Sequence, residues 1–174
     1  MSRRACKIRK LSRLRSGRPP RVVDLFSGCG GLSLGFHKNG FEIATAVEID
    51  PFAAASHYLN FHGPLGDQKP SDLAKDITRI EPEDLVAEFA NGTPVEEAVD
   101  VIIGGPPCQA FARVGRAKLR EVLDHPNAFK QDPRGNLYLR YIDYVKRLQP
   151  LAILMEMFPT SPTGQRQWRS RASV

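Results

Sequence analysis

VVDLFSGCGG, residues 22–31, is the stretch that decides the fold of this 174-residue chain. Its first half is a short apolar run that suits a buried parallel strand, and its second half is a glycine-rich turn. Residues 32–40 follow with a helical pattern, for which Gly40 supplies the stop signal. A strand, a glycine turn and a helix in this order are typical of a doubly wound α/β domain, in which ligands lie at the carboxyl ends of the strands.

The alternation of strands and helices continues along the chain. Pro51 suits the first turn of a helix that we expect to continue over residues 52–60, and a short third strand is expected to end at Asp76-Ile77. The other predicted elements are strands at residues 41–47, 99–103 and 150–156, helices at residues 81–90 and 135–148, and a long loop at residues 111–134. The pattern predicts a parallel sheet with right-handed crossovers that is incomplete at its C-terminus, because the chain stops just after the fifth strand.

Charge is concentrated at the N-terminus. Residues 1–20 contain eight of the 25 Lys and Arg residues and none of the 19 Asp and Glu residues, which leaves the rest of the chain slightly acidic. We predict a basic disordered tail at residues 1–20, a partial α/β domain at residues 21–159 and a second tail at residues 160–174. The basic tail is interpreted as a solvated extension or a misassigned start, or else as a segment that docks on phosphates without reading a sequence.

The composition argues against several classes of protein. The three cysteines, Cys6, Cys29 and Cys108, are widely spaced and form no Cys-x-x-Cys pair, so neither a disulfide framework nor a zinc site is expected. No run of 18 apolar residues is present, and the N-terminus lacks the apolar segment of a signal peptide. We therefore expect a cytoplasmic protein without a metal and without a membrane segment.

The glycine turn and the second strand together predict a cofactor site. Glu48 ends that strand twenty residues after Gly28, which is close to the spacing of acids that accept hydrogen bonds from a ribose. The turn is Gly-x-Gly-Gly, which suits a nucleoside with an amino-acid tail, such as S-adenosylmethionine, better than a pyrophosphate. Asp76 is placed to meet an adenine amino group, although such an acid is more often part of a surface turn. The alternative is that the glycines only make a tight turn and that Glu48 is a surface acid.

Gly-Gly-Pro-Pro-Cys-Gln, residues 104–109, follows the clearest strand after the first. The two prolines fix the backbone and would present the sulfur of Cys108 at the carboxyl edge of the sheet, as a nucleophile requires. A thiol reacts as the thiolate, which nearby cations favour. The alternative is a buried, inert cysteine, and we expect that role for Cys29, whereas Cys6 is given no role.

At this point the chain closely resembles one family, the DNA cytosine-C5 methyltransferases. The resemblance extends over residues 21–156, and its motifs are DLFSGCGGLS (24–33), VEID (47–50), DI (76–77), GGPPCQ (104–109) and DPRGNL (132–137). In that family the first three motifs hold the methionine, ribose and adenine parts of the cofactor, the fourth carries the nucleophile, and the fifth lines the cofactor pocket. The resemblance implies S-adenosyl-L-methionine bound by Phe26, Ser27, Gly28, Gly30, Gly31, Glu48, Ile49, Asp76, Ile77, Pro106 and Leu137.

The resemblance also implies a mechanism on double-stranded DNA. A cytosine is flipped out of the duplex, and Cys108 as thiolate attacks carbon 6 of the ring, so that carbon 5 takes the methyl group. Glu156, as the acid of the sixth motif, would hold the N3 side of the ring. Residues 109–130 would form the loop that closes over the base, with DNA contacts from Gln109, Arg113, Arg116 and Lys118. Members of the family belong to restriction-modification systems.

The chain departs from the family at its C-terminus. Glu156-Met157-Phe158 stands where the family has Glu-Asn-Val, and QWRSR at residues 167–171 fits the eighth motif but comes too soon, so we interpret it as a chance match. The remaining strands and the target-recognition domain are missing. We therefore expect a truncated protein, or one that works with a complementary C-terminal chain, and an open sheet edge with an uncovered apolar face.

Three other functions are weighed against a cytosine-C5 methyltransferase. The first is a non-catalytic remnant or subunit that binds the cofactor or a complementary chain, which the missing DNA-reading half favours. The second is an unrelated small-molecule or RNA methyltransferase, against which the Pro-Pro-Cys-Gln turn argues because methylation of an oxygen or amine needs no attacking thiol. The third is a dehydrogenase, for which the glycine pattern is wrong.

Overall fold

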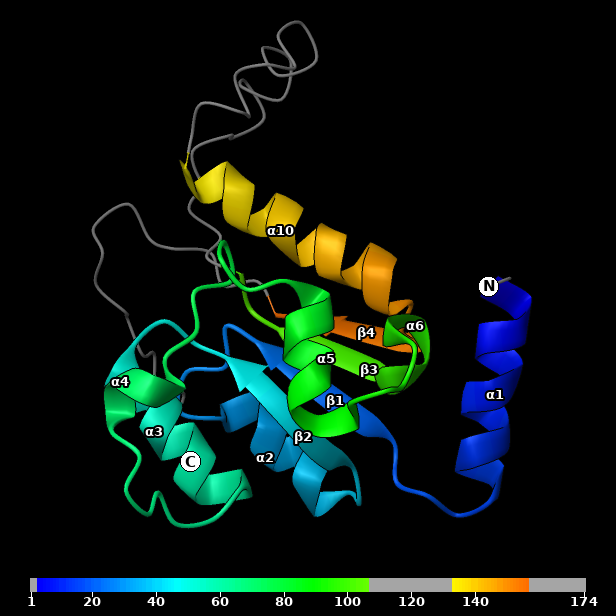
Figure 1. Cartoon of the computed structure of the whole chain (residues 1–174), viewed down its shortest axis with the longest axis horizontal. Coiled ribbons are helices and arrows are strands. Elements are labelled where there is room, and N and C mark those ends of the chain that lie inside the picture. The colour runs from blue at the N-terminus through cyan, green and yellow to red at the C-terminus, as the bar shows by residue number, and fades with distance from the viewer. Residues whose placement is uncertain (1–2, 107–132, 157–174) are drawn as a thin grey trace, which may run out of the picture.

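The computed structural model of the chain describes residues 3–106 and 133–156 (Figure 1). Helices separate all the strands in these two ranges, with four helices in succession between the second and third strands. The helices are α1 (Arg3–Arg15), α2 (Gly31–Lys38), α3 (Pro51–Phe61), α4 (Pro70–Leu73), α5 (Pro82–Ala90), α6 (Val95–Ala98) and α10 (Pro133–Leu148). The strands are β1 (Arg21–Leu25), β2 (Glu42–Val47), β3 (Val101–Gly104) and β4 (Ala152–Met155).

The described strands form one sheet in the order β2-β1-β3-β4, and every neighbouring pair is parallel. β1 lies in the middle, with Asp24 paired to Ala46 of β2 on one side and to Ile103 of β3 on the other. The loop after β1 and the loop after β3 therefore emerge side by side at the carboxyl edge, as the sequence predicts. The order reverses at β1, which is where open α/β sheets bind ligands.

The predicted third strand is wrong. The two residues expected to end it, Asp76 and Ile77, lie in a turn. The carboxylate of Asp76 accepts hydrogen bonds from the backbone N–H and the hydroxyl of Thr78, at 2.9 and 2.7 Å. An aspartate that binds the backbone two residues later closes a turn, and this local bond competes with an extended conformation. The described sheet consequently has four strands, and the predicted fifth strand is β4.

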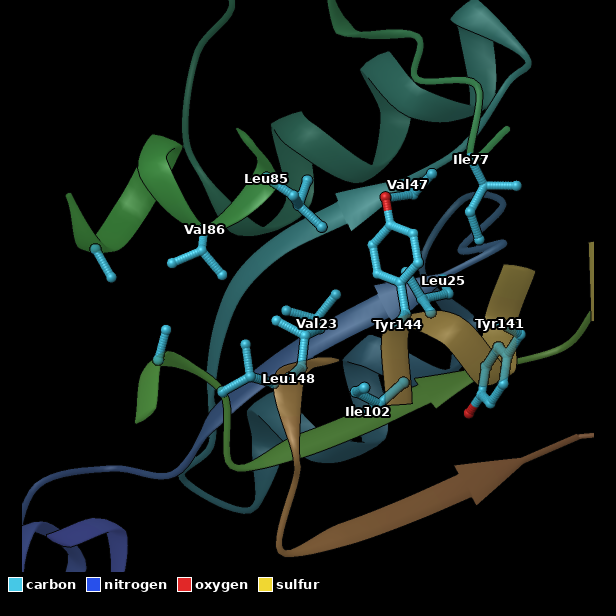
Figure 2. Packing of buried hydrophobic residues seen from close by; sticks show 13 residues of the cluster. Val23, Leu25, Val47, Ile77, Leu85, Val86, Ile102, Tyr141, Tyr144 and Leu148 are labelled. Carbon is cyan, nitrogen blue, oxygen red and sulfur yellow. The ribbon is translucent and has the colours of Figure 1, made fainter. Parts of the chain in front are cut away.

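Helices cover both faces of the sheet, which confirms the doubly wound architecture (Figure 1). On one face, β1 presents Val23 and Leu25 to α5 and α10 in the larger core cluster (Figure 2). Tyr141 and Tyr144 of α10 are fully buried in this cluster. On the other face, Val22 packs with side chains from α2 and α3. Successive residues of a strand point to opposite faces, so a β1 made of consecutive apolar residues can fill both cores.

β4 is the edge strand on the α10 side of the described sheet. Two of its apolar side chains, Ile153 and Leu154, are 48% and 44% exposed. Within the described ranges this agrees with the expected open edge and uncovered apolar surface. An edge of this kind offers unpaired backbone groups and apolar side chains to another segment.

The N-terminal segment differs from its prediction, since residues 3–15 form helix α1 instead of a disordered tail. The helix lies at the amino ends of β3 and β4, where Lys10 is 1% exposed and donates from Nζ to the carbonyls of Val99, Leu148 and Gln149, at 2.5, 3.1 and 2.8 Å. Arg13 pairs with the carboxylate of Asp100. Composition alone suggests disorder because the helix is polar; the structure orders it through hydrogen bonds to acceptors that come together only in the fold.

The helices of the described residues include none that is long and apolar enough to cross a membrane. The same residues contain no group of three or more His, Cys, Asp or Glu side chains that could hold a metal ion.

Candidate cofactor site

The site begins at the turn that follows β1, where the backbone takes conformations that L side chains rarely adopt. Phe26 has φ of 63°, Gly28 of 52° and Gly30 of 95°. A positive φ at a residue with a side chain stores strain and is found mainly at functional sites. Phe26 is held there by its N–H, which donates to the carbonyl of Val47 at 2.8 Å. The turn is therefore tied to the end of β2 through its first residue.

Gly30 is required by space as well as by conformation. A Cβ at this position would lie 2.4 Å from Cε2 of Phe61 and 3.0 Å from Cδ2 of His57, both on α3. The next residue, Gly31, begins α2, and a Cβ there would meet no atom of the described residues within 4 Å. The glycine turn is thus pressed from one side by α3, and its other side remains open.

The structure brings Glu48 to the glycine turn, as the sequence predicts. One carboxylate oxygen accepts from the N–H of Gly28 at 2.9 Å, and the other accepts from the N–H of Asp50 at 2.9 Å. Asp50 in turn caps the N-terminus of α3 by accepting from the N–H groups of Phe52 and Ala53. The neighbouring Ile49 is 66% exposed, which leaves an apolar side chain free for a flat ligand. A carboxylate has about four acceptor positions, so Glu48 retains acceptors for hydroxyl groups of a ligand.

The segment that leads toward Cys108 starts beside the same turn. Gly104 has no room for a side chain, because a Cβ would lie 2.1 Å from the carbonyl oxygen of Leu25. Glu156 lies alongside this segment: its N–H donates to the carbonyl of Gly104 at 2.9 Å, and a Cβ on Gly105 would be 3.3 Å from its carbonyl oxygen. The structure therefore places the predicted acid next to the loop after β3, where Pro106 is buried.

Asp24 adds a buried carboxylate beneath the site. It is the first residue of the motif at residues 24–33, but no role is assigned to it from sequence. It is 1% exposed, and its Oδ1 has no hydrogen-bond partner among the described residues. The pKa of Asp24 is raised to about 6, chiefly by burial and also by the charges of Glu48 and Glu156, while the hydrogen bond from Ser33 acts in the opposite direction. Glu48 and Glu156 are thus near enough to act on Asp24 through their charge, and this negative field at the carboxyl edge of the sheet suits a cationic ligand.

A buried hydrogen-bond chain continues from Asp24 into the helices. The hydroxyl of Ser33, in the first turn of α2, donates to Oδ2 of Asp24 at 2.7 Å and lies 3.1 Å from Nε2 of His57 on α3. Ser33 is fully buried, and His57 is 2% exposed. Sequence reasoning gave these two residues no role. The signal available for Ser33 is its place one turn after the glycines, whereas nothing local marks His57.

The residues expected near adenine are divided between two environments. Ile77 is 4% exposed and belongs to the core cluster on the α10 face, against which Leu137 also packs. Asp76 uses its carboxylate within its own turn, and its two hydrogen bonds from Thr78 lower its pKa. The preceding residue, Lys75, donates its N–H to the carbonyl of Glu48 at 2.7 Å. The predicted adenine segment therefore lies beside the predicted ribose acid.

A cavity of about 530 Å³ adjoins this edge along the outer side of β2. Its lining includes Ser27 and Glu48 from the cofactor turn and His57 from α3. Elsewhere in the lining, Lys75 pairs with Glu88 and donates to the hydroxyl of Thr45 at 3.1 Å. These polar groups satisfy one another, so the wall is fixed by its own contacts.

Several predicted site residues lie outside the described residues, namely Cys108, Gln109, Arg113, Arg116 and Lys118. Their roles remain predictions. The structure does correct the expectation for Cys29, which is exposed in the turn and not packed in the interior. Cys6, to which no role is assigned from sequence, is buried in α1, where its thiol donates to the carbonyl of Glu96.

Comparisons with known proteins give a consistent family assignment. Residues 20–157 match the family model described as C-5 cytosine-specific DNA methylase. The chain is 40% identical over 140 residues to a protein of Oceanobacillus iheyensis described as type II methyltransferase M.OihORF3336P, covering 80% of this chain and 29% of the relative. It is 34% identical to type II methyltransferase M1.HphI of Haemophilus parahaemolyticus, covering 77% of this chain and 31% of that protein.

A solved structure supports the same fold. The crystal structure of a DNA modification methyltransferase encoded within an E. coli prophage matches with a TM-score of 0.55 and 35% sequence identity, over 80% of this chain and 32% of that one. The chain therefore spans about a third of the length of these relatives.

Proposed function

The chain belongs to the C-5 cytosine-specific DNA methylase family, and we propose that it supplies the cofactor-binding and nucleophile-bearing part of a DNA (cytosine-5-)-methyltransferase. The observation that carries this proposal is the junction of the glycine turn, Glu48 and Glu156 at one edge of the sheet. The extent proposed for this part is residues 21–159. A cytoplasmic location is part of the same proposal.

The residues of the site fit S-adenosyl-L-methionine. When bound, this cofactor supplies a methyl group on a positively charged sulfur. Carboxylates of Asp24, Glu48 and Glu156 would favour that positive charge, since burial and the two neighbouring acids raise the pKa of Asp24 to about 6. The free acceptors of Glu48 would bind the ribose hydroxyls, and the exposed side chain of Ile49 would cover the adenine.

The other cofactor contacts in the proposal come from the neighbouring segments. Phe26, Ser27, Gly28, Gly30 and Gly31 would surround the methionine part through the backbone of the turn. Asp76 and Ile77 would lie beside adenine, with Pro106 and Leu137 closing the pocket. Thr78 uses Oδ1 of Asp76 for both of its bonds, and Oδ2 lies 3.4 Å from Nε of the exposed Arg79, so an adenine amino group would share Oδ2 with that side chain.

The chemistry on DNA is assigned to Cys108 and Glu156. The thiolate of Cys108 would form a bond to carbon 6 of a flipped cytosine, with the electron pair moving onto the ring and carbon 5 becoming nucleophilic. Glu156 would share a proton with N3 and so stabilise the charge that develops there. After methylation, loss of the carbon 5 proton to a base releases the thiolate. Duplex contacts would come from Gln109, Arg113, Arg116 and Lys118.

A second candidate is a non-catalytic subunit or remnant that binds the cofactor or a complementary C-terminal chain. The exposed Ile153 and Leu154 on edge strand β4 favour it. Under this candidate, the open edge of β4 would pair with a strand of the complementary chain.

One experiment separates the two candidates. The purified chain is incubated with S-adenosyl-L-methionine and duplex DNA that contains 5-fluorocytosine, which blocks release of the covalent adduct. We expect an adduct that disappears in Cys108→Ser and persists in Cys29→Ser, the matched control at an exposed cysteine. Cofactor binding without any adduct would instead support the second candidate, and a complementary C-terminal chain should then restore the adduct.

A further inference from the structure

A buried hydrogen-bond chain joins the cofactor turn to a helix that carries none of the family motifs. It links Asp24 at the end of β1, Ser33 in the first turn of α2 and His57 in the middle of α3, and all three side chains are at most 2% exposed. α2 and α3 lie on the same face of the sheet, where the rings of His37 and Phe61 are 5.7 Å apart (Figure 1). The hydrogen-bond chain therefore crosses three elements in the interior of the domain.

The direction of the bonds follows from the number of protons. Ser33 has one hydroxyl proton, and ionised Asp24 can only accept, so the proton points to Oδ2 at 2.7 Å. Ser33 can then only accept from His57, whose Nε2 lies 3.1 Å away and must carry the hydrogen. Burial lowers the pKa of His57 to about 4, with His62 and Lys75 acting in the same direction, so the ring is neutral at pH 7.

His57 also touches the turn directly. Gly30 is so close to α3 that a Cβ on it would lie 3.0 Å from Cδ2 of His57 and 2.4 Å from Phe61. The rings of His57 and Phe61 are themselves 4.7 Å apart between centroids. The imidazole ring thus borders the space that a side chain at position 30 would fill, while its Nε2–H fixes the serine that orients Asp24.

We propose that His57 is a positioning residue for the cofactor turn: its Nε2–H holds the Ser33 hydroxyl on Asp24, and its ring supports the backbone at Gly30. The proposal rests on the function proposed above, because it concerns the same cofactor. Among the described residues the other oxygen of Asp24, Oδ1, has no partner, so the fixed carboxylate can act on the cationic ligand. The ring also lines the cavity of about 530 Å³ beside β2, together with Ser27 of the turn.

Two substitutions at position 57 distinguish the contribution of the N–H donor from that of the ring. His57→Gln keeps an N–H donor near the position of Nε2, and His57→Phe keeps a ring of similar size without a donor. Ser33→Ala removes the hydroxyl that both depend on. Affinity for S-adenosyl-L-methionine is measured by calorimetry, hydrogen exchange is measured for the backbone of residues 26–34, and the thermal midpoint of each variant is measured as a control for folding.

We expect His57→Phe and Ser33→Ala to weaken cofactor binding about tenfold, as loss of one buried hydrogen bond implies, and His57→Gln to restore most of it. The double variant that combines His57→Phe with Ser33→Ala should bind the cofactor no more weakly than either single variant, since both substitutions break the same hydrogen-bond chain. Hydrogen exchange in residues 26–34 should accelerate in His57→Phe and not in His57→Gln. Nitrogen NMR of the imidazole should show the hydrogen on Nε2.

The outcomes distinguish this proposal from the proposed function. A wild-type chain that binds no cofactor contradicts the proposed function, and the exchange and NMR measurements still test the position of His57. Cofactor affinity and turn exchange that are equal in His57→Phe and wild type overturn the inference alone. Equal losses in the Gln and Phe variants would also overturn it, because packing and not the donor would then be responsible.

Discussion

The two ends of the sheet are built in opposite ways. At the carboxyl end, Asp24 is buried with one oxygen that has no partner among the described residues, and Phe26 holds a positive φ. At the amino end, Lys10 is just as buried but donates three hydrogen bonds to carbonyls, and Arg13 is paired with Asp100, although each member of that pair also has one buried side-chain atom without a partner among the described residues. The two ends therefore differ less in unpaired polar atoms than in how charge is balanced. The buried cations of the amino end meet carbonyls and a carboxylate of the fold, whereas the charges that act on Asp24 are those of other carboxylates. The amino end stabilises the chain, and the negative field at the carboxyl end suits a cationic ligand.

The largest effect should come from Gly30→Ala at the carboxyl end. The new Cβ meets the rings of Phe61 and His57 and sits at φ of 95°, so we expect a loss of about 2–4 kcal/mol in stability. Cofactor binding should fall on the order of 100-fold or more, because the turn must move. The matched control is Gly35→Ala in α2, where the described residues leave the space open and stability should rise by about 0.5–1 kcal/mol. Equal behaviour of the two variants in calorimetry and thermal unfolding would contradict the crowding at Gly30.

At the amino end, Lys10→Met keeps the length of the side chain and removes its charge. The carbonyls of Val99, Leu148 and Gln149 lose their donor, and we expect unfolding free energy to fall by about 2–4 kcal/mol. Affinity for S-adenosyl-L-methionine should stay within about twofold of wild type, because the site is at the other end of the sheet. Urea unfolding and calorimetry test the two halves of this prediction. A large change in affinity with unchanged stability would remove the contrast between the ends.

Asp24→Asn should stabilise the protein at neutral pH while weakening the binding of the cofactor. Burial raises the pKa of Asp24 to about 6 from an unfolded value near 4, so its favourable contribution is complete below about pH 4 and is lost as pH rises through about 6. The loss amounts to roughly 2–3 kcal/mol. The variant should therefore be more stable than wild type at pH 7.5 by a similar amount and about equal at pH 4. A gain in stability that does not depend on pH would show that another group is responsible.

The smallest effect is expected for Arg9→Ala. Arg9 pairs with Glu97 at 3.3 Å, but its side chain is 63% exposed, and such pairs contribute about 0–1 kcal/mol. The substitution should alter the thermal midpoint by no more than about a degree or two, and added salt should make this difference smaller because it screens the ion pair. If Arg9→Ala is as damaging as Lys10→Met, α1 is held by surface charge and not by the buried lysine.

Much of the fold could be predicted because its signals are local. The apolar run of β1 followed by Gly28 and Gly30 specifies a strand and a turn, and Pro51 starts α3 as expected. That Glu48 lies at the same edge as the glycine turn followed from spacing and topology, since parallel strands end at the same edge; its hydrogen bond from Gly28 is a finding of the structure. The expected strand before Asp76 failed because the hydrogen bonds of its side chain to Thr78 are a local alternative that the apolar pattern does not reveal.

By itself, the sequence determined the order β1, α2, β2 and α3, the glycine turn and the acid that meets it, because backbone conformation and strand periodicity depend on neighbouring residues. Only the tertiary structure decided that Lys10 is buried, that α1 is ordered, and that His57 reaches Ser33 beneath the turn. These contacts join residues far apart in the chain, 24 positions for His57 and Ser33 and up to 139 for Lys10 and Gln149. A buried polar side chain is ordered by hydrogen-bond partners that lie next to it only in the folded protein, and no local sequence pattern shows where those partners will be.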